Sequence, residues 1–226
     1  MPFPIWILNH AFNKDYSCHS SLKLLLQKMP LSSDTNQIQP HASKEFFTKE
    51  GILQCVLHYK NDVLHTTDGQ FCQFFNPLGE LILEQSYCNG ELDGPTHTYQ
   101  HGFLYTKTIF QKGVKNGLEE MYFPTGVVMI SRNYKDGLLD GFEKRFDEFS
   151  NLLQENFYQN GVLQGESSSY YASGALFEKK AYKNNLQTAE SVTYHQNGIL
   201  ASYGIYDKGV LVEPKTLYNA KGKELK

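Results

Sequence analysis

Short runs of apolar and polar residues fill most of this chain, and turn residues separate the runs about every 12 positions. The stretch GLEEMYFPTGVVMISRNYKDGLLDG, residues 117–141, shows the pattern. One run ends near Tyr122, the turn FPTG follows, and a second run rich in apolar and β-branched residues extends from Val127 to Tyr134. Glycine permits the positive φ that ends a strand, so KDG forms the next turn. We therefore predict a β-hairpin whose strands have about six to eight residues each.

The same unit recurs along the chain. An octapeptide with an aromatic residue first and glycines fourth and eighth appears as YCNGELDG, FQKGVKNG, YKDGLLDG and YQNGVLQG. Its first residue recurs at spacings of 28, 23, 24, 24, 24 and 24 residues, namely at Tyr59, Tyr87, Phe110, Tyr134, Tyr158, Tyr182 and Tyr206. Seven or eight units therefore occupy residues 44–226, joined head to tail.

Three sets of positions keep this period, and we predict structural roles for them. The octapeptide glycines are Gly90, Gly94, Gly113, Gly117, Gly137, Gly141, Gly161, Gly165 and Gly209. Another glycine closes the turn within each hairpin, as Gly126 does above, and Ser150 replaces it once. Six residues before the aromatic residue stands an aliphatic one: Leu53, Leu81, Leu104, Val128, Leu152, Leu176 or Leu200. The even offset puts both on one face of a strand, and we expect Tyr122 to pair with Val128 across the turn, forming buried apolar ladders.

These patterns predict an all-β fold: an elongated, single-layer, antiparallel β-meander built of hairpin repeats. Turns this frequent leave no room for helices in residues 44–226. Residues 1–43 lie outside the repeat, and SSLKLLLQKM, residues 20–29, predicts a short amphipathic helix that Pro30 ends. We expect this segment either to cover the open edge of the first hairpin or to dock a partner.

The composition argues against several classes of protein. The chain has 226 residues and a net charge of -3, so it lacks the basic face of a nucleic-acid-binding protein. The four cysteines form no C-x-x-C pair, which favours reduced thiols. The apolar start, residues 5–8, is too short for a signal peptide, and no run is long enough to span a membrane. We expect a cytoplasmic protein, with export by a specialised secretion system left open.

The octapeptides YCNGELDG, YKDGLLDG and YQNGVLQG resemble the MORN (membrane occupation and recognition nexus) repeat, in the variant found in bacterial proteins. YKNNLQTA, residues 182–189, and YKNDVLHT, residues 59–66, are degenerate copies. The resemblance covers about four-fifths of the chain, and it implies an elongated, twisted single-layer sheet with a scaffold or recognition role. Some bacterial proteins with this variant are antitoxins, whereas eukaryotic repeats accompany lipid kinases without being the catalyst.

Residues typical of catalysis or metal binding are poorly placed for chemistry. His97 and His101 would lie about 13 Å apart on a strand, too far to share a metal ion. Cys18 and His19 lack a third partner. The pairs Glu119–Glu120 and Asp147–Glu148 point their side chains apart, towards solvent. No phosphate-binding glycine motif or nucleophile elbow is present. We predict no catalytic residue, cofactor, metal or small-molecule substrate.

The polar positions between the ladders vary between units, and a partner surface requires such variety. Arg132, Asn156 and Lys180 occupy one slot, two residues before the aromatic residue, in three successive units. We predict that they form a line across the sheet, contact a protein partner, and tolerate substitution without loss of the fold. Three alternatives stay open: a membrane-surface protein, a secreted bacterial effector, and, less favoured, an enzyme of the lipid-kinase type.

Overall fold

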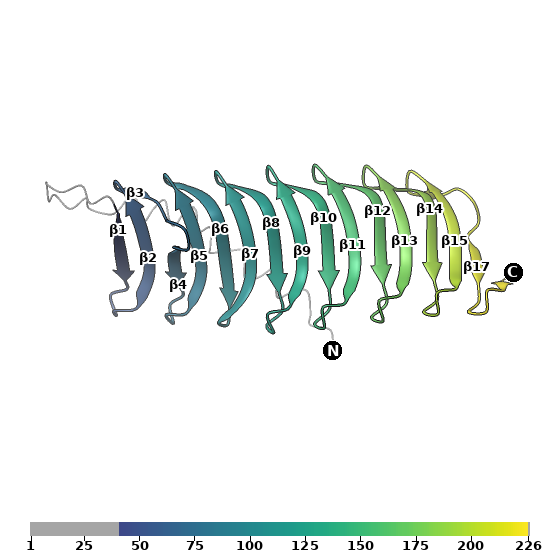
Figure 1. The fold of residues 1–226 in the computed structure, drawn as a ribbon, viewed down its shortest axis with the longest axis horizontal. Helices are drawn as coiled ribbons and strands as arrows, with labels where there is room; N and C mark the ends of the chain where they lie inside the picture. The colour runs from purple at the N-terminus through teal and green to yellow at the C-terminus, as the bar shows by residue number, and fades with distance from the viewer. Residues whose placement is uncertain (1–40, 226) are drawn as a thin grey trace. The chain divides into compact units, whose positions relative to one another are not determined.

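The computed structural model describes residues 41–225, and in this range all regular structure belongs to one open antiparallel sheet of 18 strands without helices (Figure 1). The predicted helix at 20–29 and the Cys18–His19 pair lie outside the described residues. The strands are β1 Ala42–Phe47, β2 Leu53–Lys60, β3 Val63–Leu64, β4 Cys72–Phe75, β5 Leu81–Cys88, β6 Glu91–Gln100, β7 Phe103–Gln111, β8 Val114–Tyr122, β9 Val128–Lys135, β10 Leu138–Phe146, β11 Leu152–Gln159, β12 Val162–Tyr170, β13 Leu176–Lys183, β14 Leu186–Tyr194, β15 Leu200–Asp207, β16 Val210–Leu211, β17 Thr216–Tyr218 and β18 Glu224–Leu225. The predicted all-β meander is confirmed.

Each long strand pairs with its neighbours in chain order, and the octapeptide forms the outer turns. In the turn between β9 and β10, Lys135 pairs with Leu138, and Asp136 and Gly137 both have positive φ, at 49° and 82°. This is a two-residue turn whose twist matches that of the strands. Gly137 also donates its N–H to the carbonyl of Lys115 in the preceding unit, at 2.9 Å. The first octapeptide glycine therefore closes one hairpin and links it to the previous one.

The inner turns follow a second design. The N–H of Gly126 donates to the carbonyl of Phe123 at 2.8 Å, and Gly126 has a φ of 83°. Ser150 adopts the same left-handed conformation, with a φ of 67°. Across this turn Tyr122 pairs directly with Val128, as predicted. Equivalent pairs join Phe146 to Leu152, Tyr170 to Leu176 and Tyr194 to Leu200.

Two local changes explain the irregular spacings of the first units. The spacing of 23 arises because residues 101–102 form a two-residue turn, in which Gln100 pairs with Phe103. The aromatic residue opposite Leu104 is then Tyr99, which the sequence pattern missed. The spacing of 28 arises because residues 65–71 form an excursion between β3 and β4, both of which pair with β2.

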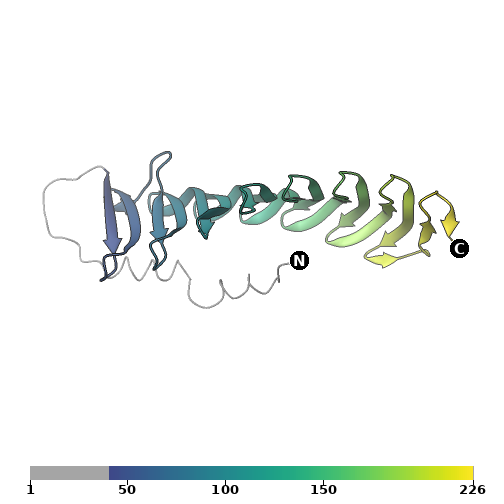
Figure 2. The ribbon, with the colours of Figure 1, turned by 90° about the horizontal axis from the view of Figure 1, so that it is seen from below.

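The second octapeptide glycine marks a bulge in the strand. Leu139 pairs with Tyr134 and Glu143 pairs with Arg132, so residues 140–142 lie opposite Asn133 alone. The strands therefore continue through this glycine and reach eight to ten residues, longer than the six to eight predicted. Bulges bend the strand that carries them, and the strands in Figure 2 are visibly curved. At Gly117, φ is +122°, and a Cβ atom would lie 3.2 Å from Cβ of Ile109.

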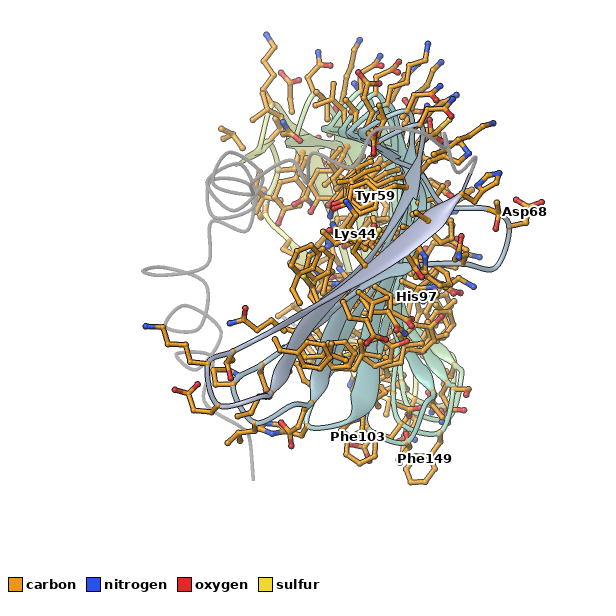
Figure 3. All side chains as sticks on the ribbon, turned by 90° about the vertical axis from the view of Figure 1, so that its left-hand side faces the viewer. Lys44, Tyr59, Asp68, His97, Phe103 and Phe149 are labelled. Atoms are coloured by element: carbon orange, nitrogen blue, oxygen red, sulfur yellow. The ribbon has the colours of Figure 1, made fainter. Side chains whose placement is uncertain are left out.

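The sheet has two faces, and we name them by their residues. The aromatic face carries Arg132 and Tyr134, and the back face carries Ser131 and Asn133. In Figure 3, Tyr59 and Lys44 lie on one side of the sheet and His97 on the other. One slot of the aromatic face, which we call the central row, crosses β2, β4–β15 at Leu57, Cys72, Gln85, Thr96, Thr108, Glu119, Arg132, Glu143, Asn156, Ser167, Lys180, Ser191 and Gly204.

The central row is the most deeply buried part of the sheet. Glu119 and Glu143 are each 4 % exposed, whereas the ladder residues Leu152 and Tyr158 are only half-buried. In a single layer, a side chain is buried only if neighbours on its own face close over it, so the curvature makes the aromatic face concave. We expected the ladders to be buried, and Tyr87 is, at 7 % exposure, but Leu152 and Tyr158 are less buried than Asn156 between them.

Candidate functional site

Arg132, Asn156 and Lys180 lie in one line, as the sequence predicts. Glu143 pairs with both Arg132 and Asn156, and Ser167 pairs with both Asn156 and Lys180. Each predicted residue is therefore two strands from the next, a distance of about 10 Å. The alignment alone does not make them a binding site, because all three side chains already have polar partners within the sheet.

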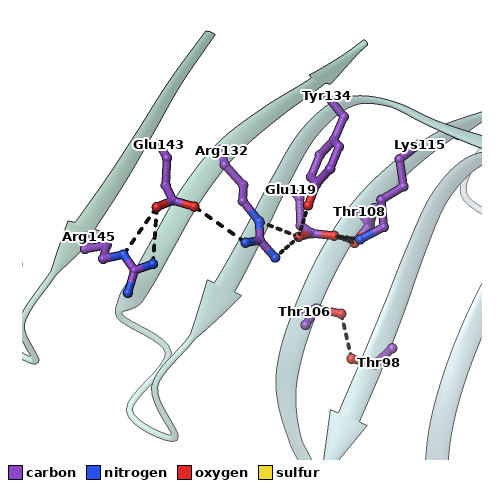
Figure 4. A network of polar contacts seen from close by, with 9 residues as sticks. All are labelled: Thr98, Thr106, Thr108, Lys115, Glu119, Arg132, Tyr134, Glu143 and Arg145. Carbon is purple, nitrogen blue, oxygen red and sulfur yellow. Dashed lines mark hydrogen bonds and ion pairs between the residues drawn. The ribbon is translucent and has the colours of Figure 1, made fainter. Parts of the chain in front are cut away.

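The middle of the central row is a chain of ion pairs (Figure 4). Arg132 donates from Nε to Oε1 of Glu119 at 2.7 Å, and its Nη2 lies 2.6 Å from the same oxygen. Its Nη1 lies 3.6 Å from Oε2 of Glu143, and Arg145 approaches the other oxygen of that carboxylate at 3.2 Å. At the opposite end, Lys115 pairs with Glu119. Two buried carboxylates thus alternate with three cations across β8, β9 and β10.

Burial and pairing act in opposite directions on Glu119. Burial alone would raise the pKa of this carboxyl, but hydrogen bonds and charge from Lys115 and Arg132 hold the pKa below its usual range. Thr108 adds a hydrogen bond, donated from Oγ1 to Oε2 of Glu119 at 3.0 Å. Glu119 is therefore a structural anion, held ionised at neutral pH, and it is unsuited to act as a general acid or base there.

The remaining predicted residues are also paired. Ser167 donates to Oδ1 of the buried Asn156 at 2.6 Å, and Lys180 pairs with Glu178 at 2.7 Å. The expectation that these positions tolerate alanine does not follow from this geometry, because removing Arg132 leaves buried carboxylates without their partner. Sequence analysis missed Glu119 and Glu143. Their slot, two residues after the second octapeptide glycine, is fixed by the repeat and could have identified them.

Glu119 and Glu120 point to opposite faces, as proposed, but only one of them is solvated. Glu120 lies on the back face, where its Oε2 accepts a hydrogen bond from the Tyr122 hydroxyl at 2.6 Å. Glu119 is buried on the aromatic face, so the prediction of a solvated side chain was wrong for it. Asp147 faces its own inner turn, where Oδ1 accepts the N–H groups of Phe149 and Asn151 at 2.9 Å and 2.8 Å.

The two histidines do not form a joint site. His97 points its Nδ1 at Oε2 of Glu84, 3.2 Å away, and that oxygen also accepts the Tyr99 hydroxyl at 2.6 Å. Burial would raise the pKa of Glu84, but these bonds and one from Gln73 lower it. His101 lies in the exposed turn between β6 and β7. Across residues 41–225, no three His, Cys, Asp or Glu side chains cluster in a way that could hold a metal ion.

The fold and the octapeptide geometry agree with a comparison against protein families. The family model described as MORN repeat variant matches residues 115–136 and 163–184. These two segments are similar to that repeat. Each match contains the second octapeptide glycine, an inner turn and the next aromatic residue, and the remaining units keep the same strand register around the matched segments. No curated protein matches the chain. An open meander that contains segments similar to this repeat fits a repeat scaffold. The described part of the chain has no helix able to cross a bilayer.

Proposed function

We propose that the array is a non-catalytic scaffold that binds a protein partner through its aromatic face. The observation that carries this proposal is the tyrosine ladder. Tyr134, Tyr158 and Tyr182 each lie opposite a glycine of the neighbouring strand, at Gly117, Gly141 and Gly165. Glycine provides no side chain to cover a ring, and all three tyrosines are only half-buried. On Tyr134 the neighbouring cations Lys115 and Arg132 lie over part of the ring, at 4.8 Å and 5.7 Å from its centroid. Tyrosine is enriched at protein interfaces because it combines apolar area with a polar tip.

The central row supports a binding role without catalysis. Its charged groups are committed to one another, which leaves a preformed, rigid floor beneath the tyrosine ladder. Lys180, Lys115 and Arg145, with 28 %, 36 % and 50 % of their side chains exposed, are cations that a partner could reach from this floor. Of the three residues predicted from sequence, we assign contact with the partner to Lys180, and support of the floor to Arg132 and Asn156. Neutralisation of a toxin would be one case of this function.

A matched pair of variants tests the proposal. Lys180 and Lys179 are neighbours on β13, point to opposite faces, and each pairs with a glutamate at 2.7 Å, Glu178 and Glu166 respectively. The full chain is tagged and purified from its own cells, and co-purified proteins are quantified by mass spectrometry. We expect Lys180→Glu to lower recovery of the specific partner about tenfold or more, because a reversed charge is then placed against it.

Lys179→Glu is the control for the aromatic face, and it should retain the partner even if it weakens contacts made by the back face, because it leaves the aromatic face unchanged. Both variants are first checked for an unchanged circular dichroism spectrum. Equal recovery with the two variants, or a loss confined to Lys179→Glu, would show that the partner does not use the aromatic face.

A further inference from the structure

The back face carries a second row with an ordered pattern of charge. Directly paired residues on β7 to β13 read Lys107, Glu120, Ser131, Lys144, Glu155, Ser168 and Lys179. The charges follow the order positive, negative, neutral twice in succession, and a final positive residue, Lys179, ends the row. These seven positions span about 29 Å at the normal strand spacing. From β8 to β13 the row is self-complementary: when it is reversed about the midpoint between Lys144 and Glu155, each charge meets its opposite and the two serines meet. Lys107 of β7 then lies against Val192 of β14, outside the complementary part.

An apolar cluster lies beside this midpoint. Phe142 and Phe157 are directly paired on β10 and β11, and their rings meet edge to face with centroids 5.1 Å apart. Phe142 is 47 % exposed, and Leu118, two strands away on the same face, is 40 % exposed. No second layer covers this face within residues 41–225. Exposed large apolar side chains that gather on one surface are typical of an interaction site.

The same reversal also brings complementary residues of the apolar cluster together. A two-fold axis parallel to the strands, between β10 and β11, places Phe142 of one chain against Phe157 of the other. It places Leu118 against the small side chain of Ala181, and Asn133 against Glu166. All six lie in the row next to the charged one, on the same face. One symmetry operation therefore matches both the apolar and the charged rows.

We propose that the back face is the docking surface for a second copy of this chain, with the two-fold axis between β10 and β11. Sheets that pack face to face lie about 10 Å apart, a distance that Phe142 and Phe157 fill from both sides. The pair of Lys144 and Glu155, 2.8 Å apart within one chain, would lie over the same pair in reverse order. Four alternating charges then neutralise one another, and Glu120 of each chain meets Lys179 of the other. The aromatic faces stay outward, free for the partner proposed above.

A charge swap tests this arrangement specifically. The double variant Lys144→Glu with Glu155→Lys keeps the ion pair within each chain and the complementarity within its own dimer. Mixed with wild type, it places Lys against Lys and Glu against Glu across the axis. We expect native mass spectrometry of full chains with different masses to detect both homodimers, and the mixed dimer at less than about a tenth of its statistical share. A mixed dimer at its statistical share would overturn the proposed axis.

A second pair of variants tests the apolar centre. Phe142→Ser should weaken the dimer about tenfold or more in analytical ultracentrifugation, because an aromatic contact at the centre of the interface is lost. Phe149→Ser is the control, since Phe149 is 84 % exposed in the inner turn, away from the row, and should leave the dimer unchanged. A wild-type chain that stays monomeric at about 100 μM would overturn the proposal and leave the back face to a different occupant. These readouts need no partner, so they are independent of the proposed scaffold function.

Discussion

The central row is built in two different ways at the two ends of the sheet. In the first hairpins its buried residues are apolar or nearly so: Leu57 is 2 % exposed and Cys72 is 0 % exposed. From β6 onward the same slot holds Thr96, Thr108 and then the charged residues of the ion-pair chain. The backbone geometry around the slot is the same in both regions. The repeat therefore specifies where side chains are buried, and it leaves open how their burial is made favourable.

The apolar and the charged residues of the central row contribute differently to the stability of the sheet. Leu57 gains stability from leaving water, whereas Glu119 must first lose hydration and recovers that loss through Lys115 and Arg132. Buried ion pairs are often no more stabilising than apolar residues of similar volume. Their advantage here is selectivity in pairing, because a shift of β9 by one residue would separate Arg132 from Glu119 and move it to the back face. The apolar row has no such directional bond.

The largest expected effect on stability comes from removing one charged and one apolar side chain of the central row. Arg132→Ala should lower the free energy of unfolding by about 3 kcal/mol, because Glu119 and Glu143 stay buried without a shared cation. Leu57→Ala should cost about 2–5 kcal/mol through a cavity. Chemical denaturation at pH 7 measures both. The two losses should differ on acidification to about pH 5, where Arg132→Ala alone recovers stability, because burial without the arginine favours the protonated form of Glu119. If the stability of both variants responded equally to acidification, the two regions would not differ in how burial is made favourable.

A smaller effect on stability is expected when apolar residues replace the charged residues of the central row. The triple change Glu119→Leu, Arg132→Leu and Glu143→Leu converts the middle of the row to the chemistry of Leu57. We expect stability to stay within about 1 kcal/mol of wild type or to rise, since apolar replacements of buried ion networks often behave so. Thermal and denaturant melts measure the change. A loss as large as that of Arg132→Ala would show that the ion pairs stabilise the middle region in their own right.

The pH dependence of the wild type distinguishes the regions without any substitution. The folded pKa of Glu119 is lowered relative to an unfolded value of about 4.3. The unfolded chain therefore binds the proton first, and the stability from Glu119 is present above about pH 4.3 and is lost as pH falls through the folded pKa. Hydrogen exchange followed from pH 6 downward should show β8–β10 losing protection more steeply than β2, where the central row holds Leu57. Amide exchange that declines evenly along the sheet would contradict this assignment.

The sequence predicted what the repeat specifies. The turns, the meander and the pairing of Tyr122 with Val128 follow from local preferences that recur with the period. Burial in the central row did not follow, because it depends on curvature produced by the bulge at the second glycine, and a flat hairpin would expose the same polar residues. Tyr99 was missed for a related reason, since one turn is a residue shorter and shifts the local count.

The smallest effect concerns the boundary between the regions, where Thr96 and Thr108 follow one another in the central row at 6 % and 5 % exposure. The Thr108 hydroxyl donates to Glu119, whereas Oγ1 of Thr96 is buried without a hydrogen-bond partner among the described residues. Valine has nearly the same shape as threonine, so the substitutions differ mainly in the hydroxyl removed. Thr108→Val should cost about 1 kcal/mol, because a bond to a buried carboxylate is lost. Thr96→Val should gain about 1 kcal/mol, because an unsatisfied polar atom is removed. Denaturant melts of the two variants, compared with wild type, resolve opposite signs of this size. Two losses would mean that Thr96 already belongs to the polar region and that the boundary lies nearer to Cys72.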